Sequence, residues 1–228
     1  MIRRMVRSLL FLAFLAIPGV AVASPITFLF TGSVTGVDPA LSGTFDTTQT
    51  LSGSYTFDST SAFGCPTFNN SGCIVPLTAL DFTIGAYTVT KGTGGLILVN
   101  NNTPVFFGSP RDRYRVLAGD VSGPLVDGKR PNDFEFTLSD FTQTVFSSDA
   151  LPLIPPDLSA FQSTPWELSF GGGFLTPADD VFGEITSLTL SPEGNPVNPI
   201  PEPGTLLLLG SGLLSVAGYG KRELFRKG

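Results

Sequence analysis

Residues 134–139, Phe-Glu-Phe-Thr-Leu-Ser, alternate an apolar with a polar side chain at every step. Side chains of a β-strand point to opposite faces in turn, so this period of two predicts a strand with one buried and one solvated face. The same alternation recurs in residues 51–57 and in residues 166–170. Other short stretches rich in Val, Ile, Phe and Tyr extend the series. They are residues 26–35, 80–89, 96–100, 105–107, 114–118 and 184–190.

The strand candidates, about nine of them, are separated by clusters of Gly, Pro, Asn and Asp. Two antiparallel sheets that pack their apolar faces together are the simplest way to bury such strands. The sequence therefore predicts an all-β fold, an antiparallel β-sandwich of the jelly-roll kind, and a closed barrel is the alternative. Residues 147–161 contain three prolines and neither period, so we expect them to cross the surface in an extended form.

A secretory leader precedes this body. The first seven residues carry three arginines, and residues 9–17 form an unbroken apolar run, within the ~7–15 residues of a signal-peptide core. Small residues at Ala21 and Ala23 suit signal peptidase, so we expect cleavage after Ala23. An uncleaved anchor is the alternative, but nine apolar residues fall well short of the ~20 that span a bilayer.

The charge of the chain is unevenly distributed. The formal net charge is −6, but residues 24–200 hold only six basic against 17 acidic residues, a net charge of −11. Nucleic-acid binding depends on Lys and Arg that neutralise phosphates, so an acidic body of this kind excludes a nucleic-acid partner. Its length suits a single domain.

The two cysteines, Cys65 and Cys73, lie close together in an exported chain, which predicts a disulfide that closes a short surface loop. The chain contains no histidine. This excludes a Ser-His-Asp triad, a Cys-His pair and histidine-ligated zinc.

Carboxylates are the remaining candidates for catalysis or metal binding. Asp133 and Glu135 share one strand face, and we expect the same of Asp179, Asp180 and Glu184 near a turn. A glycosidase needs two carboxylates about 5–9.5 Å apart, and Ca²⁺ takes several oxygen ligands. An acidic body offers such groups by composition alone, so we interpret them as solvated carboxylates and predict no catalytic residue, no metal site and no cofactor.

Arg111, Arg113 and Arg115 fall at alternate positions and therefore share one face of a strand. They can either grip an anionic polysaccharide or pair with acidic residues on a neighbouring strand, and we favour the pairing. Trp166 is in step with the apolar Leu168 and Phe170, so we expect it in the core and not on a sugar-binding surface.

The C-terminal end has three parts. A Pro-rich linker, residues 191–199, leads to the motif Pro201, Glu202 and Pro203. Residues 204–219 are then free of charge, about 24 Å as a helix against a hydrocarbon core of about 30 Å, which predicts a membrane helix. A basic end follows that would keep the C-terminus cytoplasmic. Its members are Lys221, Arg222, Arg226 and Lys227. The physics of this tail fits both a permanent anchor and a transient one that is cut near Pro-Glu-Pro.

The order of these parts resembles the PEP-CTERM sorting signal. That resemblance covers residues 200–228 and implies recognition by an exosortase, a membrane protease-transpeptidase of Gram-negative bacteria that make exopolysaccharide. The body is also similar to a recurrent group of such sorted proteins, in residues 51–58, 112–116 and 147–161.

The sequence thus divides into a signal peptide (1–23), a β-body (24–190), a linker (191–199) and a sorting tail (200–228). We expect signal peptidase and an exosortase as processing partners, and exopolysaccharide as a partner of the mature protein. We expect the chain in the inner membrane before processing, then at the cell surface or outside the cell. A structural surface protein is the favoured function, and a carbohydrate-binding module or a glycan-cleaving enzyme are the alternatives.

Overall fold

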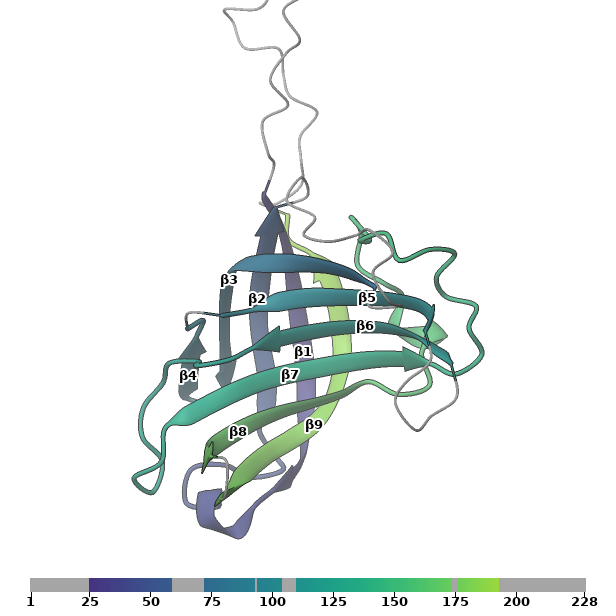
Figure 1. The fold of residues 1–228 in the computed structure, drawn as a ribbon. Helices are drawn as coiled ribbons and strands as arrows, with labels where there is room; N and C mark the ends of the chain where they lie inside the picture. Colours follow the sequence, from purple (N-terminus) through teal and green to yellow (C-terminus); the bar gives the residue numbers. More distant parts are fainter. Residues whose placement is uncertain (1–24, 59–71, 93, 104–109, 174–175, 193–228) are drawn as a thin grey trace, which may run out of the picture.

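The computed structural model describes residues 25–58, 72–92, 94–103, 110–173 and 176–192. In these ranges the chain forms strands and two short 3-10 helices, η2 (Pro39–Leu41) and η3 (Leu158–Ala160) (Figure 1). The strands are β1 (Pro25–Val37), β2 (Thr50–Asp58), β3 (Cys73–Ile84), β4 (Tyr87–Thr90), β5 (Leu96–Thr103), β6 (Arg111–Ala118), β7 (Pro131–Asp140), β8 (Pro165–Gly173) and β9 (Thr176–Leu190).

The strands form one closed wall in place of two packed sheets. All neighbouring pairs are antiparallel. The order β2-β1-β9-β8-β7-β6-β5-β3 returns to its start because β3 also pairs with β2. Eight strands therefore make a barrel, and β4 lies outside it, paired with the second half of β3. The predicted jelly-roll sandwich is wrong, and the closed barrel, its alternative, is the architecture.

The curvature that closes the wall depends on long-range contacts, which the alternation of apolar and polar residues does not predict. The pairing of β1 with β9 shifts register beside Gly32 and again beside Gly36, and such irregularities bend a strand and increase its twist. A Cβ on Gly32 would lie 2.8 Å from the carbonyl oxygen of Glu184 and 2.9 Å from Nε1 of Trp166. The period-two pattern specifies which face is apolar, and these close approaches let the sheet curl around that face.

The interior of the barrel is filled with aromatic rings. The largest fully buried side chains are Trp166, Tyr55, Tyr114, Phe28, Phe30, Phe45, Phe57, Phe82, Phe134, Phe136 and Phe170. The ring centroids of Phe82 and Phe134 lie 4.3 Å apart, and those of Phe30 and Phe134 lie 5.9 Å apart. An eight-stranded barrel is just wide enough for side chains to fill it, so these rings act as a packed core.

Two tyrosine hydroxyls form a hydrogen bond within this core. The hydroxyls of Tyr55 and Tyr114 are 2.9 Å apart, which joins β2 to β6 across the interior. Burial raises the pKa of both phenols well above their usual value, so both stay neutral. A buried hydroxyl needs a hydrogen-bond partner, and each of these two supplies the other's.

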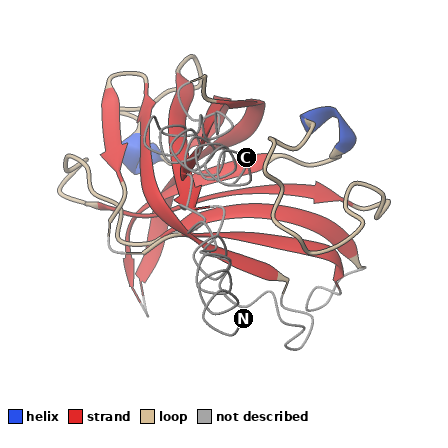
Figure 2. Ribbon diagram, turned by 90° about the horizontal axis from the view of Figure 1, so that it is seen from above, coloured by secondary structure: helices blue, strands red, loops and turns tan. Residues whose placement is uncertain are grey.

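Residues 147–161 cross from β7 to β8 without forming a strand, as predicted, and include η3. Figure 2 shows this crossing on one side of the barrel wall, with η3 at its outer edge. The strand candidate at residues 80–89 is divided by a turn at Gly85 into the end of β3 and the start of β4. Strand candidate 105–107 lies outside the described residues.

Several predicted features cannot be placed on this fold. In the part of the chain that the structure describes, no helix is long and apolar enough to cross a membrane. The predicted signal helix, the linker and the membrane helix at 204–219 lie outside the described residues. Cys73 is buried at the start of β3, but Cys65 lies outside those residues, so the disulfide stays a prediction.

Candidate functional site

The residues assigned to export and sorting lie outside the described ranges. They are Ala21, Ala23, Pro201, Glu202, Pro203, Lys221, Arg222, Arg226 and Lys227. The candidate site on the folded body is the outer face of β6, with the end of β7 beside it.

β6 alternates strictly between the two sides of the barrel wall. Asp112, Tyr114, Val116 and Ala118 are buried on its inner side. Arg111, Arg113 and Arg115 lie on its outer side, half-buried, as the sequence predicted. Successive arginines are about 7 Å apart along the strand, because a strand rises 3.2–3.4 Å per residue. We call these three arginines, together with Phe141 at the end of β7, the arginine face.

Arg115 is paired on this face. Its Nη2 and Nε donate to Oε1 of Glu135 on β7, at 2.7 and 3.0 Å. Thr137 donates to the same oxygen at 2.7 Å. The expected pairing across strands is thus present for Arg115, with a glutamate as its partner.

Arg111 and Arg113 differ from Arg115, because neither forms an ion pair with any described carboxylate. The guanidinium carbon of Arg111 lies 4.8 Å from the centroid of the Phe141 ring, a cation–π contact. Nε of Arg113 is shielded from solvent and has no hydrogen-bond partner among the described residues. Burial lowers the pKa of Arg113, and the charges of Arg115 and Arg111 lower it further. The pairing that we favoured therefore accounts for one arginine of three.

Two buried aspartates lie on the inner side of the wall, beneath the arginine face. Asp112 and Asp140 are opposite each other on β6 and β7, and both are fully buried. Oδ1 of Asp112 accepts a hydrogen bond from the backbone of Asn102 at 2.8 Å, and Oδ2 accepts one from Phe146 at 2.9 Å. Both carboxylates therefore accept hydrogen bonds from backbone amides, and neither forms an ion pair with a described arginine.

Asp140 holds the start of the crossing. Its carboxylate accepts hydrogen bonds from the backbone amides of Thr142, Thr144 and Val145, at 2.7, 2.7 and 3.1 Å. Burial alone would raise the pKa of Asp140, but the hydrogen bonds from these residues outweigh it and lower the pKa well below its usual value. The carboxylate is thus ionised at neutral pH and fixes the turn that carries Phe141.

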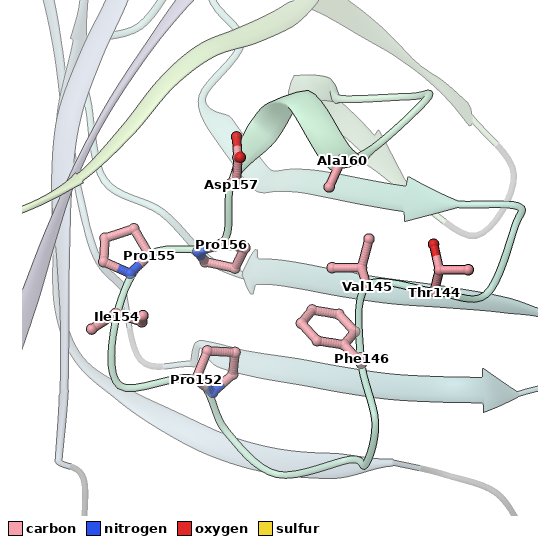
Figure 3. A pocket seen from close by; sticks show the side chains of 9 residues that line it. All are labelled: Thr144, Val145, Phe146, Pro152, Ile154, Pro155, Pro156, Asp157 and Ala160. Carbon is pink, nitrogen blue, oxygen red and sulfur yellow. The ribbon is translucent and has the colours of Figure 1, made fainter.

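The crossing itself encloses a shallow hollow of about 530 Å³. Figure 3 shows Val145 and Phe146 on one side of it and the segment with Pro152, Ile154 and Pro155 on the other. Its lining is mostly apolar, with Thr144 and Asp157 as polar members. Asp157 accepts a hydrogen bond from the backbone of Ser159 at 2.9 Å, so its Oδ1 caps η3. The hollow therefore offers a mostly apolar surface.

The first carboxylate pair singled out in the sequence is engaged in contacts with neighbouring side chains. Asp133 and Glu135 share the outer face of β7, as predicted. Glu135 is bound to Arg115, and Asp133 is exposed and accepts a hydrogen bond from Asn132.

The second acidic group is divided between two faces. Asp179 contacts Lys129 in an ion pair, whereas Glu184 accepts a hydrogen bond from Thr164 at 2.8 Å. The expectation that Asp179, Asp180 and Glu184 share one face is wrong, because adjacent residues of β9 point to opposite sides. Among the described residues, no group of three or more His, Cys, Asp or Glu side chains could hold a metal ion.

Trp166 is 1% exposed and lies in the core, and its Nε1 donates to the carbonyl oxygen of Ser33 at 3.1 Å. The sequence pattern does not identify Asp112, Asp140 or Phe141 as members of this site. Asp140 followed by Thr142 is a local signal that was available, because Asp commonly accepts hydrogen bonds from residues two positions later in a turn. No local signal predicts that Phe141 stacks on Arg111, since the two are neighbours only through strand pairing.

Comparison with known proteins adds a finding on the tail. The family model of the PEP-CTERM protein-sorting motif matches residues 199–222. No curated protein and no solved structure matches the chain. The resemblance of the tail to PEP-CTERM signals is confirmed, whereas the similarity of the body to a group of such proteins finds no support in these comparisons.

Proposed function

We propose that this chain, an exported protein whose PEP-CTERM motif makes it an exosortase substrate, becomes a structural component of the cell surface or of the matrix around it. The observation that carries the proposal is the sorting motif at residues 199–222, and the secretory leader predicted at the other end of the chain supports it. A chain with both signals is addressed to the outside of the cell.

The tail suggests an order of events. The basic end would hold the apolar stretch 204–219 across the inner membrane, and this would keep Pro-Glu-Pro at the outer boundary. Proline disfavours helical backbone in the residue before it, so Pro201 and Pro203 would suit a protease site, which generally takes an extended chain. Cleavage there would remove the only predicted span and release the barrel towards the surface or the exopolysaccharide.

Two features of the barrel support a structural role over a catalytic one. Its interior is packed with rings, and two of the carboxylates considered for catalysis, Glu135 and Asp179, are held in ion pairs with Arg115 and Lys129. We propose accordingly that the mature protein is not an enzyme and needs no cofactor.

Replacement of Glu202 by Ala tests the sorting step, because it leaves the apolar stretch and the basic end unchanged. We expect the variant to accumulate uncleaved in the inner membrane, while the wild type loses its tail and leaves that fraction. Glu193→Ala, which removes an acid from the linker outside the motif, is the matched control and should behave like the wild type. If the wild type and Glu202→Ala both stay in the inner membrane with the tail attached, the tail is a permanent anchor.

The N-terminal boundary has its own test. N-terminal sequencing of the processed protein should begin at Ser24, because cleavage after Ala23 satisfies signal peptidase. Material at the cell surface that begins at Met1 would contradict the assignment of residues 1–23.

A further inference from the structure

The arginine face concentrates positive charge on an otherwise acidic molecule. Three of the six basic residues between positions 24 and 200 lie on one side of β6. Arg115 is neutralised by Glu135, but Arg111 and Arg113 have no carboxylate partner among the described residues. Two neighbouring unpaired cations repel each other, and a bound anion would relieve that repulsion.

The aromatic ring at this face adds a second kind of contact. Phe141 is 47% exposed although it lies against Arg111, so part of its ring surface is open to solvent. A sugar ring has apolar C–H faces that pack on an aromatic ring, and an acidic sugar also carries a group that a guanidinium binds. Arg111 and Phe141 lie side by side, so together they can contact both the acid group and the C–H face of an acidic sugar.

The geometry of β6 limits which partners can use this face. β6 is hydrogen-bonded to β5 on one edge and to β7 on the other, so its backbone cannot accept an additional strand. A partner must therefore bind through side chains alone. Residues 24–200 carry a net charge of −11. This charge repels densely charged polyanions, such as nucleic acids and anionic membranes, more strongly than a polysaccharide with spaced acid groups.

We propose that Arg111, Arg113 and Phe141 form a binding surface for an acidic polysaccharide, with the guanidinium groups on its acid groups and the phenyl ring against its sugar rings. The proposal names a class of partner for the surface protein proposed above. It rests on that proposed function, because only an exported protein would meet an extracellular polysaccharide. The binding itself is a property of the folded barrel and does not depend on sorting.

The test uses the full-length chain, purified in a neutral detergent, with polygalacturonate as the probe and dextran as its uncharged counterpart. We expect saturable binding of polygalacturonate that weakens as salt is added, and no binding of dextran. Equal binding of the two polymers, or no binding of polygalacturonate, would overturn the proposal. Polyglutamate and micelles with phosphatidylglycerol are tested in parallel, and preference for either would assign the face to an acidic peptide or a membrane instead.

Variants locate the site. R111Q/R113Q should weaken polygalacturonate binding by at least about tenfold, because two charge-assisted contacts are lost. K91Q/R130Q removes the same charge elsewhere and should stay within about twofold of the wild type, as expected for a loss of general attraction only. Phe141→Ala should weaken binding by about threefold, since the ring contact is smaller than the charged ones.

Unchanged binding in R111Q/R113Q, or an equal loss in K91Q/R130Q, would contradict the assignment. Thermal unfolding of each variant checks that the barrel is intact, and Phe141, being exposed, provides a variant whose effect does not pass through the core. Because the binding assay uses purified protein, its result is independent of the Glu202→Ala experiment. The binding proposal can therefore fail while the sorting proposal holds, and the reverse is also possible.

Discussion

The two faces of β6 have opposite chemistry although they alternate residue by residue. Inward, Tyr114 and Val116 are fully buried, and Tyr114 packs against Phe136 with ring centroids 6.4 Å apart. Outward, Arg111 and Arg113 carry charges without a partner among the described carboxylates. The difference suggests two roles for β6: its inner face stabilises the barrel, and its outer face is the surface for which we propose binding.

The largest test of this contrast is an interior substitution. Phe136→Ala removes a ring that packs against Phe30, Tyr55, Tyr114 and Phe134, and we expect the free energy of unfolding to fall by about 3–5 kcal/mol. Chemical denaturation measures this loss. Leu125→Ala, at a side chain 65% exposed, should change stability by less than about 0.5 kcal/mol. Similar losses in the two variants would mean that the interior is not the main source of stability.

The second test concerns the boundary between the two faces. Asp140→Asn replaces an acceptor of three backbone amides, and we expect a loss of about 2–3 kcal/mol at pH 7. Because the pKa of Asp140 is lower in the folded protein than its usual 3.8, the carboxylate stabilises the fold above about pH 4. This contribution disappears as the pH falls below that value.

The gap between wild type and Asp140→Asn should therefore narrow on acidification, as followed by denaturation at a series of pH values. Asp133→Asn, at an exposed carboxylate on the same strand, is the matched control and should show little change. A gap that is the same at pH 7 and pH 3 would mean that the charge of Asp140 is not what holds the crossing.

The third test concerns the hydrogen bond between Tyr55 and Tyr114 in the interior. Tyr114→Phe leaves the hydroxyl of Tyr55 buried without its partner, and we expect a cost of about 1–2 kcal/mol. The double variant Tyr55→Phe/Tyr114→Phe removes both hydroxyls and should be about as stable as the wild type or more so. A double-mutant cycle measures the coupling, and strictly additive losses would show that the two hydroxyls do not depend on each other.

The stability of the protein at alkaline pH is a second test of the Tyr55–Tyr114 pair. Burial raises the pKa of both phenols above 10.0, so the folded state resists ionisation that the unfolded chain allows. Stability should fall as the pH rises above about 10, and the double variant should lose less of it.

The smallest effect is expected on the outer wall. Burial raises the pKa of Glu167, and the neighbouring charges of Asp180 and Glu135 add to the rise. The ionised side chain therefore disfavours folding above its usual pKa of 4.5, and this penalty is lost as the pH falls. Glu167→Gln should stabilise the protein at pH 7 by less than about 1 kcal/mol, and the gain should vanish near pH 4. A loss of stability at pH 7 would show that Glu167 has a favourable partner in the wall.

The sequence by itself determined the strands and the sorting motif of this protein. Period-two alternation identifies apolar faces such as that of residues 134–139, because a strand sorts its side chains without help from the rest of the chain. The sorting motif is equally local, since a protease reads a few consecutive residues.

Only the tertiary structure decided how the strands close and which charges are left unpaired. Sandwich and barrel bury the same alternating faces, and the choice between them depends on bulges and close approaches, such as that of Gly32 to Trp166, made by residues far apart in the chain. The same holds for the arginines: the sequence places them on one face, but strand register gives Glu135 to Arg115 and Phe141 to Arg111. Register is a long-range property, and the partners of a side chain on a sheet follow from it.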